Sequence, residues 1–243
     1  MTGVADEDCA MTSDRLELYF SSTRAGGPGQ IYRSVRATVD DAWSAPVHEA
    51  ALDGGDWDVT PEPASDGVTM WFTSNRLPVT GTDIFITTRA TPADAWGAPL
   101  LVDSLYVPDT FEYGPSSSRG GLTMVFSSDR TGNYDLYVAT RFATTDPWSA
   151  PAPIAELATS FEETDPFLTD DGLTLYFTSN VTGNRELVVA TRTSVSEPFV
   201  APVPLDELNS AFDEQDIWLS PDGHHVIFAS NRTGDYDVYE AER

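Results

Sequence analysis

Short runs of apolar residues, each bounded by turn-forming residues, recur along the whole chain. Residues 173–179 (LTLYFTS) and 224–230 (HHVIFAS) are rich in β-branched and aromatic side chains and follow an Asp-Gly pair. Such runs between turn residues are typical of strands. No segment keeps the period of an amphipathic helix over several turns. The pattern predicts an all-β chain of short antiparallel strands.

The strand pattern returns about every 50 residues. Its most regular position is a phenylalanine near the end of an apolar run, at Phe20, Phe72, Phe126, Phe177 and Phe228. A turn and a second β-rich segment follow each one and end at Arg36, Arg89, Arg141, Arg192 and Arg243. Five units of about four strands each predict a five-bladed β-propeller. We expect one domain over residues 1–243, with repeats near 4–55, 56–109, 110–160, 161–211 and 212–243.

The fifth repeat differs from the others after its arginine. The first four arginines are followed by an aromatic residue in an x-Ala-Pro context, at Trp43, Trp96, Trp148 and Phe199. This segment predicts the outer strand of a blade, and no counterpart follows Arg243. We therefore expect either a three-stranded fifth blade or an outer strand supplied by residues upstream of this sequence.

Two stretches carry a resemblance to a known family: residues 165–180 (DPFLTDDGLTLYFTSN) and 220–239 (SPDGHHVIFASNRTGDYDVY). They resemble the WD40-like repeats of TolB-type propellers, in which a Pro-Asp-Gly turn precedes an apolar strand, Ser-Asn-Arg, Gly and Asp-Leu-Tyr. The third copy departs from this pattern with Ser-Arg-Gly-Gly, and the α/β domain that precedes the propeller in TolB has no counterpart here. The resemblance implies a periplasmic or secreted setting.

Composition narrows the classes of partner. Asp and Glu number 39 against 13 basic residues, every one of them arginine, and the net charge is −26. Such a surface repels phosphate backbones, which excludes nucleic acid as an expected partner. No apolar run is long enough for a membrane helix, so membrane insertion is not expected. A protein partner, a polar or carbohydrate ligand, or a cation remains, and we expect a monomer.

An acidic residue precedes each repeat phenylalanine at a constant distance and forms the strongest candidate site. In a propeller the first strand of each blade lines the channel, so these acids should ring one channel mouth, with three further acids two residues on pointing the same way. The two sets are Asp6, Asp58, Glu112, Glu163 and Glu214, and Asp8, Asp165 and Asp216. Closely spaced carboxylates favour a cation such as calcium or a polar ligand. The other interpretation is structural pairing of each acid with the repeat arginines Arg24, Arg76, Arg130 and Arg232. The fourth copy has Val181 at this position, and we expect Arg185 to take the place of the missing arginine.

Aromatic residues beside these acids add Trp57, Tyr113 and Trp218 to the candidate ligand site. Aromatic platforms next to carboxylates are typical of sugar sites, and a glycoside hydrolase would need two carboxylates in distinct environments. Glu112, Glu163 or Asp216 would then act at the axis. Adjacent strand residues point to opposite faces, so His224 and His225 do not predict a zinc site. We assign no catalytic residue; the sequence favours a non-enzymatic binding or scaffold propeller, with a carbohydrate-active propeller as the alternative.

Overall fold

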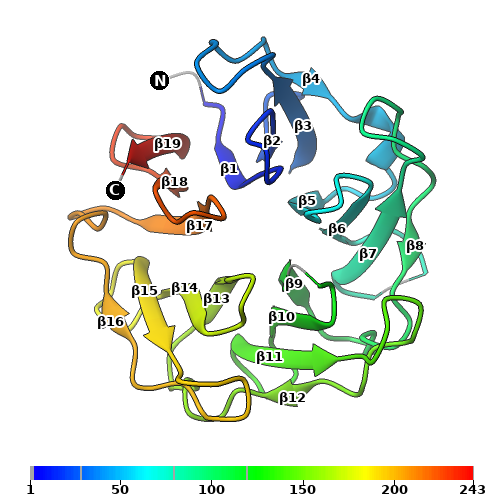
Figure 1. Cartoon of the computed structure of the whole chain (residues 1–243). Helices are drawn as coiled ribbons and strands as arrows, with labels where there is room; N and C mark the ends of the chain where they lie inside the picture. The colour runs from blue at the N-terminus through cyan, green and yellow to red at the C-terminus, as the bar shows by residue number, and fades with distance from the viewer. Residues whose placement is uncertain (1–2, 28, 79, 119, 243) are drawn as a thin grey trace.

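Five small antiparallel sheets surround a central channel, and together they form a five-bladed β-propeller (Figure 1). The structure is a computed structural model and describes residues 3–27, 29–78, 80–118 and 120–242. Arg243, the last of the repeat arginines, lies outside the described residues. Four sheets have four strands and the fifth has three, as the sequence predicts. The all-β, five-bladed architecture is confirmed.

Each blade is a simple meander whose first strand faces the channel (Figure 1). The innermost strands are β1 (Asp6–Met11), β5 (Asp58–Pro63), β9 (Glu112–Ser117), β13 (Glu163–Leu168) and β17 (Glu214–Leu219). The second strands are β2 (Glu17–Ser22), β6 (Thr69–Ser74), β10 (Thr123–Ser128), β14 (Thr174–Ser179) and β18 (His225–Ser230). The third strands are β3 (Gln30–Val35), β7 (Asp83–Thr88), β11 (Asp135–Thr140), β15 (Glu186–Thr191) and β19 (Asp237–Glu242). The outer strands are β4 (Val47–His48), β8 (Leu100–Leu101), β12 (Ala152–Pro153) and β16 (Val203–Pro204).

The core lies between neighbouring blades. The phenylalanines of the second strands are buried there, with Phe72 and Phe126 fully inaccessible to solvent. On the outside, the arginine that follows each of the first four third strands stacks on the aromatic residue that precedes the outer strand, as Arg36 does on Trp43 at 4.2 Å. The same contact joins Arg141 to Trp148 at 4.1 Å. The repeated x-Ala-Pro segment is therefore a packing element. A 3₁₀ turn, η1 (Ala50–Leu52), lies between β4 and β5.

The innermost strands share an irregularity that decides where their side chains point. Each strand loses regular register against the second strand part way along its length, as between Glu7 and Ala10. The residue two positions after the repeat acid has a positive φ in every blade, at Asp8, Thr60, Gly114, Asp165 and Asp216. Asp and Asn tolerate this left-handed conformation better than most other residues with a side chain, and Gly adopts it freely. The bulge turns these side chains away from the direction that regular alternation would give them.

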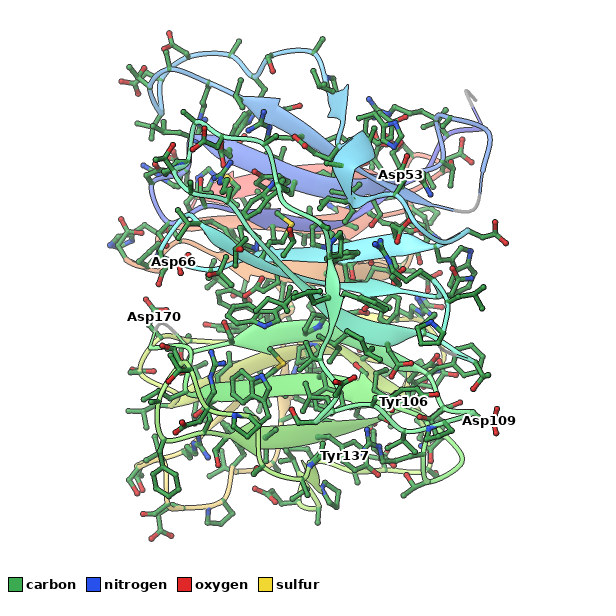
Figure 2. All side chains as sticks on the ribbon, turned by 90° about the vertical axis from the view of Figure 1, so that its right-hand side faces the viewer. Asp53, Asp66, Tyr106, Asp109, Tyr137 and Asp170 are labelled. Carbon is green, nitrogen blue, oxygen red and sulfur yellow. The ribbon has the colours of Figure 1, made fainter. Side chains whose placement is uncertain are left out.

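The propeller has two different faces (Figure 2). Turns between first and second strands, including those of Asp66 and Asp170, lie on one face, and the linkers that enter the blades, near Asp53 and Asp109, lie on the other. The channel opens at the linker mouth on the second face and at the turn mouth on the first. Among the described residues, no helix is long and apolar enough to cross a membrane.

Candidate functional site

The repeat acids lie at the linker mouth, and four of the five are bound by arginine. Arg130 donates to Glu112 at 2.9 Å and Arg232 donates to Glu214 at 3.0 Å. Arg76 pairs with Asp58, and Arg24 pairs with Asp6 at 2.6 Å. The carboxylates of Asp58, Glu112 and Glu214 are fully buried, and the serine that ends the second strand also donates to each of these three. These contacts join the linker to the hairpin of the same blade and describe a structural role.

The fourth blade departs from this arrangement. Glu163 accepts hydrogen bonds from the Thr159 hydroxyl at 2.6 Å and from the Thr159 backbone N–H at 3.1 Å. Burial nevertheless raises the pKa of Glu163. Arg185 does not bind Glu163; it reaches the channel and donates to Gln215 at 2.6 Å. Val181 occupies the position of the repeat arginine, and Arg185 does not take over its pairing with the repeat acid. The guanidinium of Arg185 lies in the channel instead.

The second acidic set forms the centre of the candidate site. One carboxylate oxygen from each of Asp8, Asp165 and Asp216 lies within 4.8 Å of the corresponding oxygens of the other two. All three residues are buried, at 6%, 8% and 7% exposure. They occupy the bulge position of β1, β13 and β17, where the other two blades have Thr60 and Gly114. Three of five equivalent positions thus place carboxylates together in the channel.

Hydrogen bonds only partly stabilise these three carboxylates; those of Ser21 and Tyr113 lower the pKa of Asp8 without offsetting its burial. Tyr113 donates to Asp8 at 2.8 Å, the Asp8 backbone N–H donates to Asp216 at 3.0 Å, and Thr164 donates to Oδ2 of Asp165 at 2.8 Å. Within the described chain, the buried Oδ1 of Asp165 has no hydrogen-bond partner. An unpaired buried carboxylate oxygen is costly, so this atom is a position where a bound cation would be stabilising.

Burial and mutual repulsion shift the pKa values of these groups. Burial is the largest cause for each: it raises the pKa of Asp8 to about 6 and that of Asp216 well above its usual value. The pKa of Asp165 is also raised by burial, while the charge of Arg185 lowers it. At the linker side of the cluster, burial and the neighbouring Asp8 raise the pKa of Glu7 to about 7. Burial thus favours the protonated forms of these acids, and the guanidinium of Arg185 opposes this effect at Asp165.

The aromatic candidates separate between the two ends of the channel. Trp57 and Tyr113 line a cavity of about 230 Å³ at the linker mouth, together with Tyr134, Arg185 and Gln215. Trp218 instead lines a larger cavity, about 370 Å³, at the turn mouth. Between the two mouths, a narrow space of about 50 Å³ borders the three aspartates. The sequence placed all these residues at one mouth; the structure distributes them along the whole channel.

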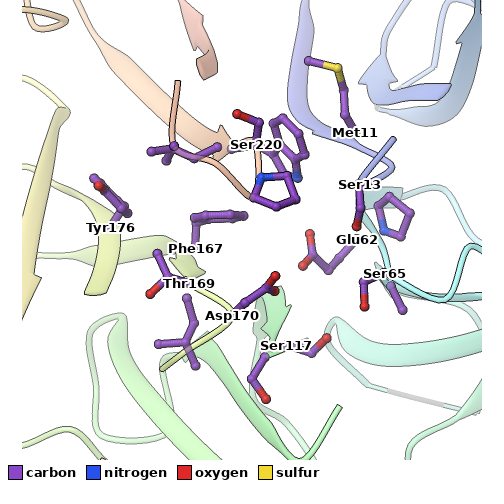
Figure 3. A pocket seen from close by; sticks show the side chains of 18 of the residues that line it. Met11, Ser13, Glu62, Ser65, Ser117, Phe167, Thr169, Asp170, Tyr176 and Ser220 are labelled. Atoms are coloured by element: carbon purple, nitrogen blue, oxygen red, sulfur yellow. The ribbon is translucent and has the colours of Figure 1, made fainter. Parts of the chain in front are cut away.

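The turn mouth contains residues that the pattern of the five repeats did not identify as candidates (Figure 3). Glu62, Phe167 and Asp170 point toward the middle of this cavity. Glu62 occupies the position four residues after the repeat acid, where the other blades have Ala10, Ser116, Phe167 and Trp218. The sequence could have indicated Glu62 only through the variation at this repeat position, on a strand that faces the channel.

Comparisons with known proteins agree with the fold. No protein-family model matches the sequence, and no curated protein sequence matches it. A solved structure described as a TolB from Agrobacterium tumefaciens superposes with a TM-score of 0.60 at 17% identity, covering 98% of this chain and 76% of that one. TolB from Acinetobacter baumannii gives 0.55 at 16% identity, covering 96% of this chain and 51% of that one. The α-L-arabinofuranosidase PaAbf62A from Podospora anserina gives 0.65 at 11% identity, over 98% and 91%.

The chain is thus a five-bladed β-propeller. Its blades are similar to those of TolB-type propellers over nearly the whole chain, and the repeat-level resemblance seen in the sequence is confirmed. At these identities the similarity defines the fold and leaves the function to the residues of the channel.

Proposed function

We propose that this chain is a non-enzymatic binding propeller whose channel holds a hard divalent cation, calcium being expected, between Asp8, Asp165 and Asp216. The observation that carries the proposal is the convergence of three buried carboxylate oxygens within 4.8 Å of one another. Calcium–oxygen distances are about 2.3–2.6 Å, so oxygens on opposite sides of one ion lie about 5 Å apart. The spacing of the three aspartates fits one ion held in common.

The surroundings of the three aspartates support the same conclusion. Oδ1 of Asp165 lacks a donor among the described residues, and the guanidinium of Arg185 donates to Gln215 rather than to an aspartate. Carboxylates are the ligands that hard cations prefer, and among the described residues the cluster consists of the three aspartates, without a histidine or cysteine. A cation would favour the ionised forms of the three aspartates, whose pKa values burial raises.

The linker mouth is the surface we propose for a partner protein or polar ligand. Its rim carries exposed aromatic side chains in sequence segments that enter the blades: Trp57, Phe111, Phe161 and Phe212, each between 40% and 49% exposed. Exposed aromatic residues on a strongly acidic surface are typical of interaction sites. With TolB-type propellers as the structural neighbours, we further propose a periplasmic or secreted monomer.

Calcium titration tests the cation site. Protein treated with EDTA and dialysed is titrated with CaCl₂ or MgCl₂ at constant ionic strength, and binding is followed by calorimetry and by the melting temperature. We expect one calcium per chain and a higher melting temperature, because a ligand at 100 times its Kd stabilises by about 2.7 kcal/mol. Asp165→Asn should remove the calcium response and be more stable than wild type in EDTA.

Asp109→Asn is the matched control, because Asp109 also has a positive φ, of 61°, but is exposed on the linker face and is not part of the cluster. It should respond to calcium as wild type does. An identical calcium response in Asp165→Asn and wild type would show that the ion binds elsewhere, and no response in wild type would refute the site.

A carbohydrate-active propeller is the second candidate. The observation that favours it lies at the turn mouth, where burial raises the pKa of Glu62 to about 8 and aromatic side chains line the same cavity. A carboxylic acid kept protonated near neutral pH is what a glycosidase requires as general acid. The arabinofuranosidase PaAbf62A, which shares the fold, is consistent with it. Hydrolysis of aryl glycosides that is lost in Glu62→Gln would support this function, and equal background rates would count against it.

A further inference from the structure

The cavity of about 230 Å³ at the linker mouth is lined by residues that are not repeated around the ring. Two repeat positions supply much of its wall: the residue after the repeat acid and the residue before the third strand. The first position holds Glu7, Val59, Tyr113, Thr164 and Gln215. The second position holds Gly29, Thr82, Tyr134, Arg185 and Tyr236. Residues that build every blade recur, as the repeat phenylalanines do, so this variation gives the linker mouth a chemistry of its own.

Aromatic side chains of the second and third blades border this cavity. Trp57, from the linker that enters β5, lines it together with Tyr113 and Tyr134 of the third blade. Trp57 is 43% exposed and belongs to none of the hydrophobic clusters found among the described residues. Its indole has an apolar face and a polar N–H at the edge. Trp57 therefore offers a flat apolar surface to a ligand and is not needed for packing between blades.

Polar groups of the fourth and fifth blades border the same cavity. Arg185 donates to Gln215 at 2.6 Å, and Gln215 donates to Glu7 at 3.1 Å, so the guanidinium and the amide are held in one hydrogen-bonded chain. Glu162 and Asp165 also line the cavity. A guanidinium only donates hydrogen bonds, an ionised carboxylate only accepts them, and an amide does both. The cavity thus presents donor and acceptor groups together.

The charges around the cavity favour a ligand without net charge. Arg185 borders the same space as the carboxylates of Glu162 and Asp165. A cationic ligand would meet the guanidinium and an anionic ligand would meet the carboxylates, each with repulsion. A neutral molecule that both donates and accepts hydrogen bonds avoids either repulsion. A sugar is such a molecule, and the C–H groups on the face of its ring match an aromatic surface.

We propose that the linker mouth binds a neutral sugar unit, with the face of its ring on Trp57 and its hydroxyls toward Arg185 and Gln215. This inference rests on the linker mouth being the binding surface proposed above, and it names the ligand class for that surface. The cavity has room for one sugar ring, and a longer saccharide would extend over the exposed rim. The site is distinct from the turn mouth, where Glu62 is the candidate general acid.

The first test compares neutral sugars with charged and zwitterionic molecules. Binding of the methyl glycosides of glucose, galactose and mannose to the full chain is measured by saturation-transfer NMR and calorimetry. We expect at least one of them to bind. Its amino-sugar and uronic acid counterparts, and L-leucine as a zwitterion, should bind at least tenfold more weakly. Absence of binding by all three glycosides would overturn the proposal, as would equal or tighter binding of a charged counterpart or of L-leucine.

Variants of two exposed aromatic residues locate the sugar. Trp57→Ala should fold, because Trp57 lies outside the described hydrophobic clusters, and should bind the sugar at least tenfold more weakly than wild type. Trp57→Phe keeps a ring and should recover most of the affinity. Phe111→Ala is the matched control: Phe111 also precedes a repeat acid and is 40% exposed, but it does not line the cavity, so this variant should bind as wild type does. Unchanged affinity in Trp57→Ala, or an equal loss in Phe111→Ala, would contradict the site.

The same variants separate this inference from the cation site and from the turn mouth. Trp57→Ala should keep the calcium response of wild type while it loses the sugar. Calcium binding without sugar binding would refute only this inference and leave the axial cation site intact. Sugar binding that is lost in Glu62→Gln but kept in Trp57→Ala would place the sugar at the turn mouth and overturn the assignment to the linker mouth.

Discussion

Replacing Asp83 by asparagine should stabilise the protein, increasingly so as pH rises. Asp83 begins β7, is 1% exposed, and has no hydrogen-bond partner for either carboxylate oxygen within the described residues. Glu112 of the next blade adds a negative charge nearby, and burial together with that charge raises the pKa of Asp83 to about 9. Arg130 binds Glu112, and its charge only partly offsets the rise in the pKa of Asp83.

The sign of the effect follows from the raised pKa. An unfolded aspartate titrates near pH 3.9, so at pH 7 folding requires Asp83 to take up a proton. The stability associated with the protonated group is fully present below about pH 4 and is lost as pH rises toward 9. One pH unit corresponds to about 1.4 kcal/mol at most. Allowing for relaxation around the site, Asp83→Asn should raise the free energy of unfolding by roughly 2 kcal/mol at pH 7.

Urea unfolding of wild type and variant at pH 5, 7 and 8.5 measures this difference. The gain in Asp83→Asn should grow across the series. Asp237→Asn is the control at the same repeat position: Asp237 is exposed and accepts a hydrogen bond from Thr233 at 2.8 Å, so its replacement should change stability little at any of these pH values. A gain that is independent of pH, or a loss of stability in Asp83→Asn, would refute the reasoning.

Two further predictions concern the scaffold. Arg130→Ala should lower the free energy of unfolding by about 3 kcal/mol, because it leaves the fully buried Glu112 without its cation. Arg24→Ala should lower it clearly less in the same urea assay, because its partner Asp6 is 24% exposed. Equal losses of stability in the two variants would contradict this ranking. The described part of the chain leaves the outer edge of β19 unpaired, whereas each other third strand has a partner there. A peptide of residues 196–204 should therefore bind by strand addition and raise the melting temperature, and a scrambled peptide with the same effect would count against pairing at this edge.

The sequence predicted the architecture well because every blade repeats the same pattern of strand and turn residues. The phenylalanine and arginine positions recur in all five copies, and the acid–arginine pairs of four blades follow from the same register. Local turns and alternation are enough to define a blade, and the number of copies defines the ring. The prediction failed to separate the two acidic sets, because it assumed regular alternation through Asp8, where the strand in fact bulges at positive φ.

Contacts across the channel could not be predicted from spacing. Asp8, Asp165 and Asp216 converge only because the blades are arranged around a common axis, and their distances depend on the width of that ring. Glu62 was missed because its repeat position has a different residue in each blade, and a position that varies in this way cannot be told from an unconstrained one. The direction of Arg185, toward Gln215 instead of Glu163, depends on a rotamer in the folded channel.

A crystal structure of the protein soaked in MnCl₂, with anomalous data collected for manganese, tests the central claim most directly. Manganese takes the same oxygen ligands as calcium and is visible by its own scattering. The account predicts an anomalous peak on the channel axis, within coordination distance of carboxylate oxygens of Asp8, Asp165 and Asp216. A channel without such a peak, in a crystal where the three aspartates are accessible to the soak, would contradict it.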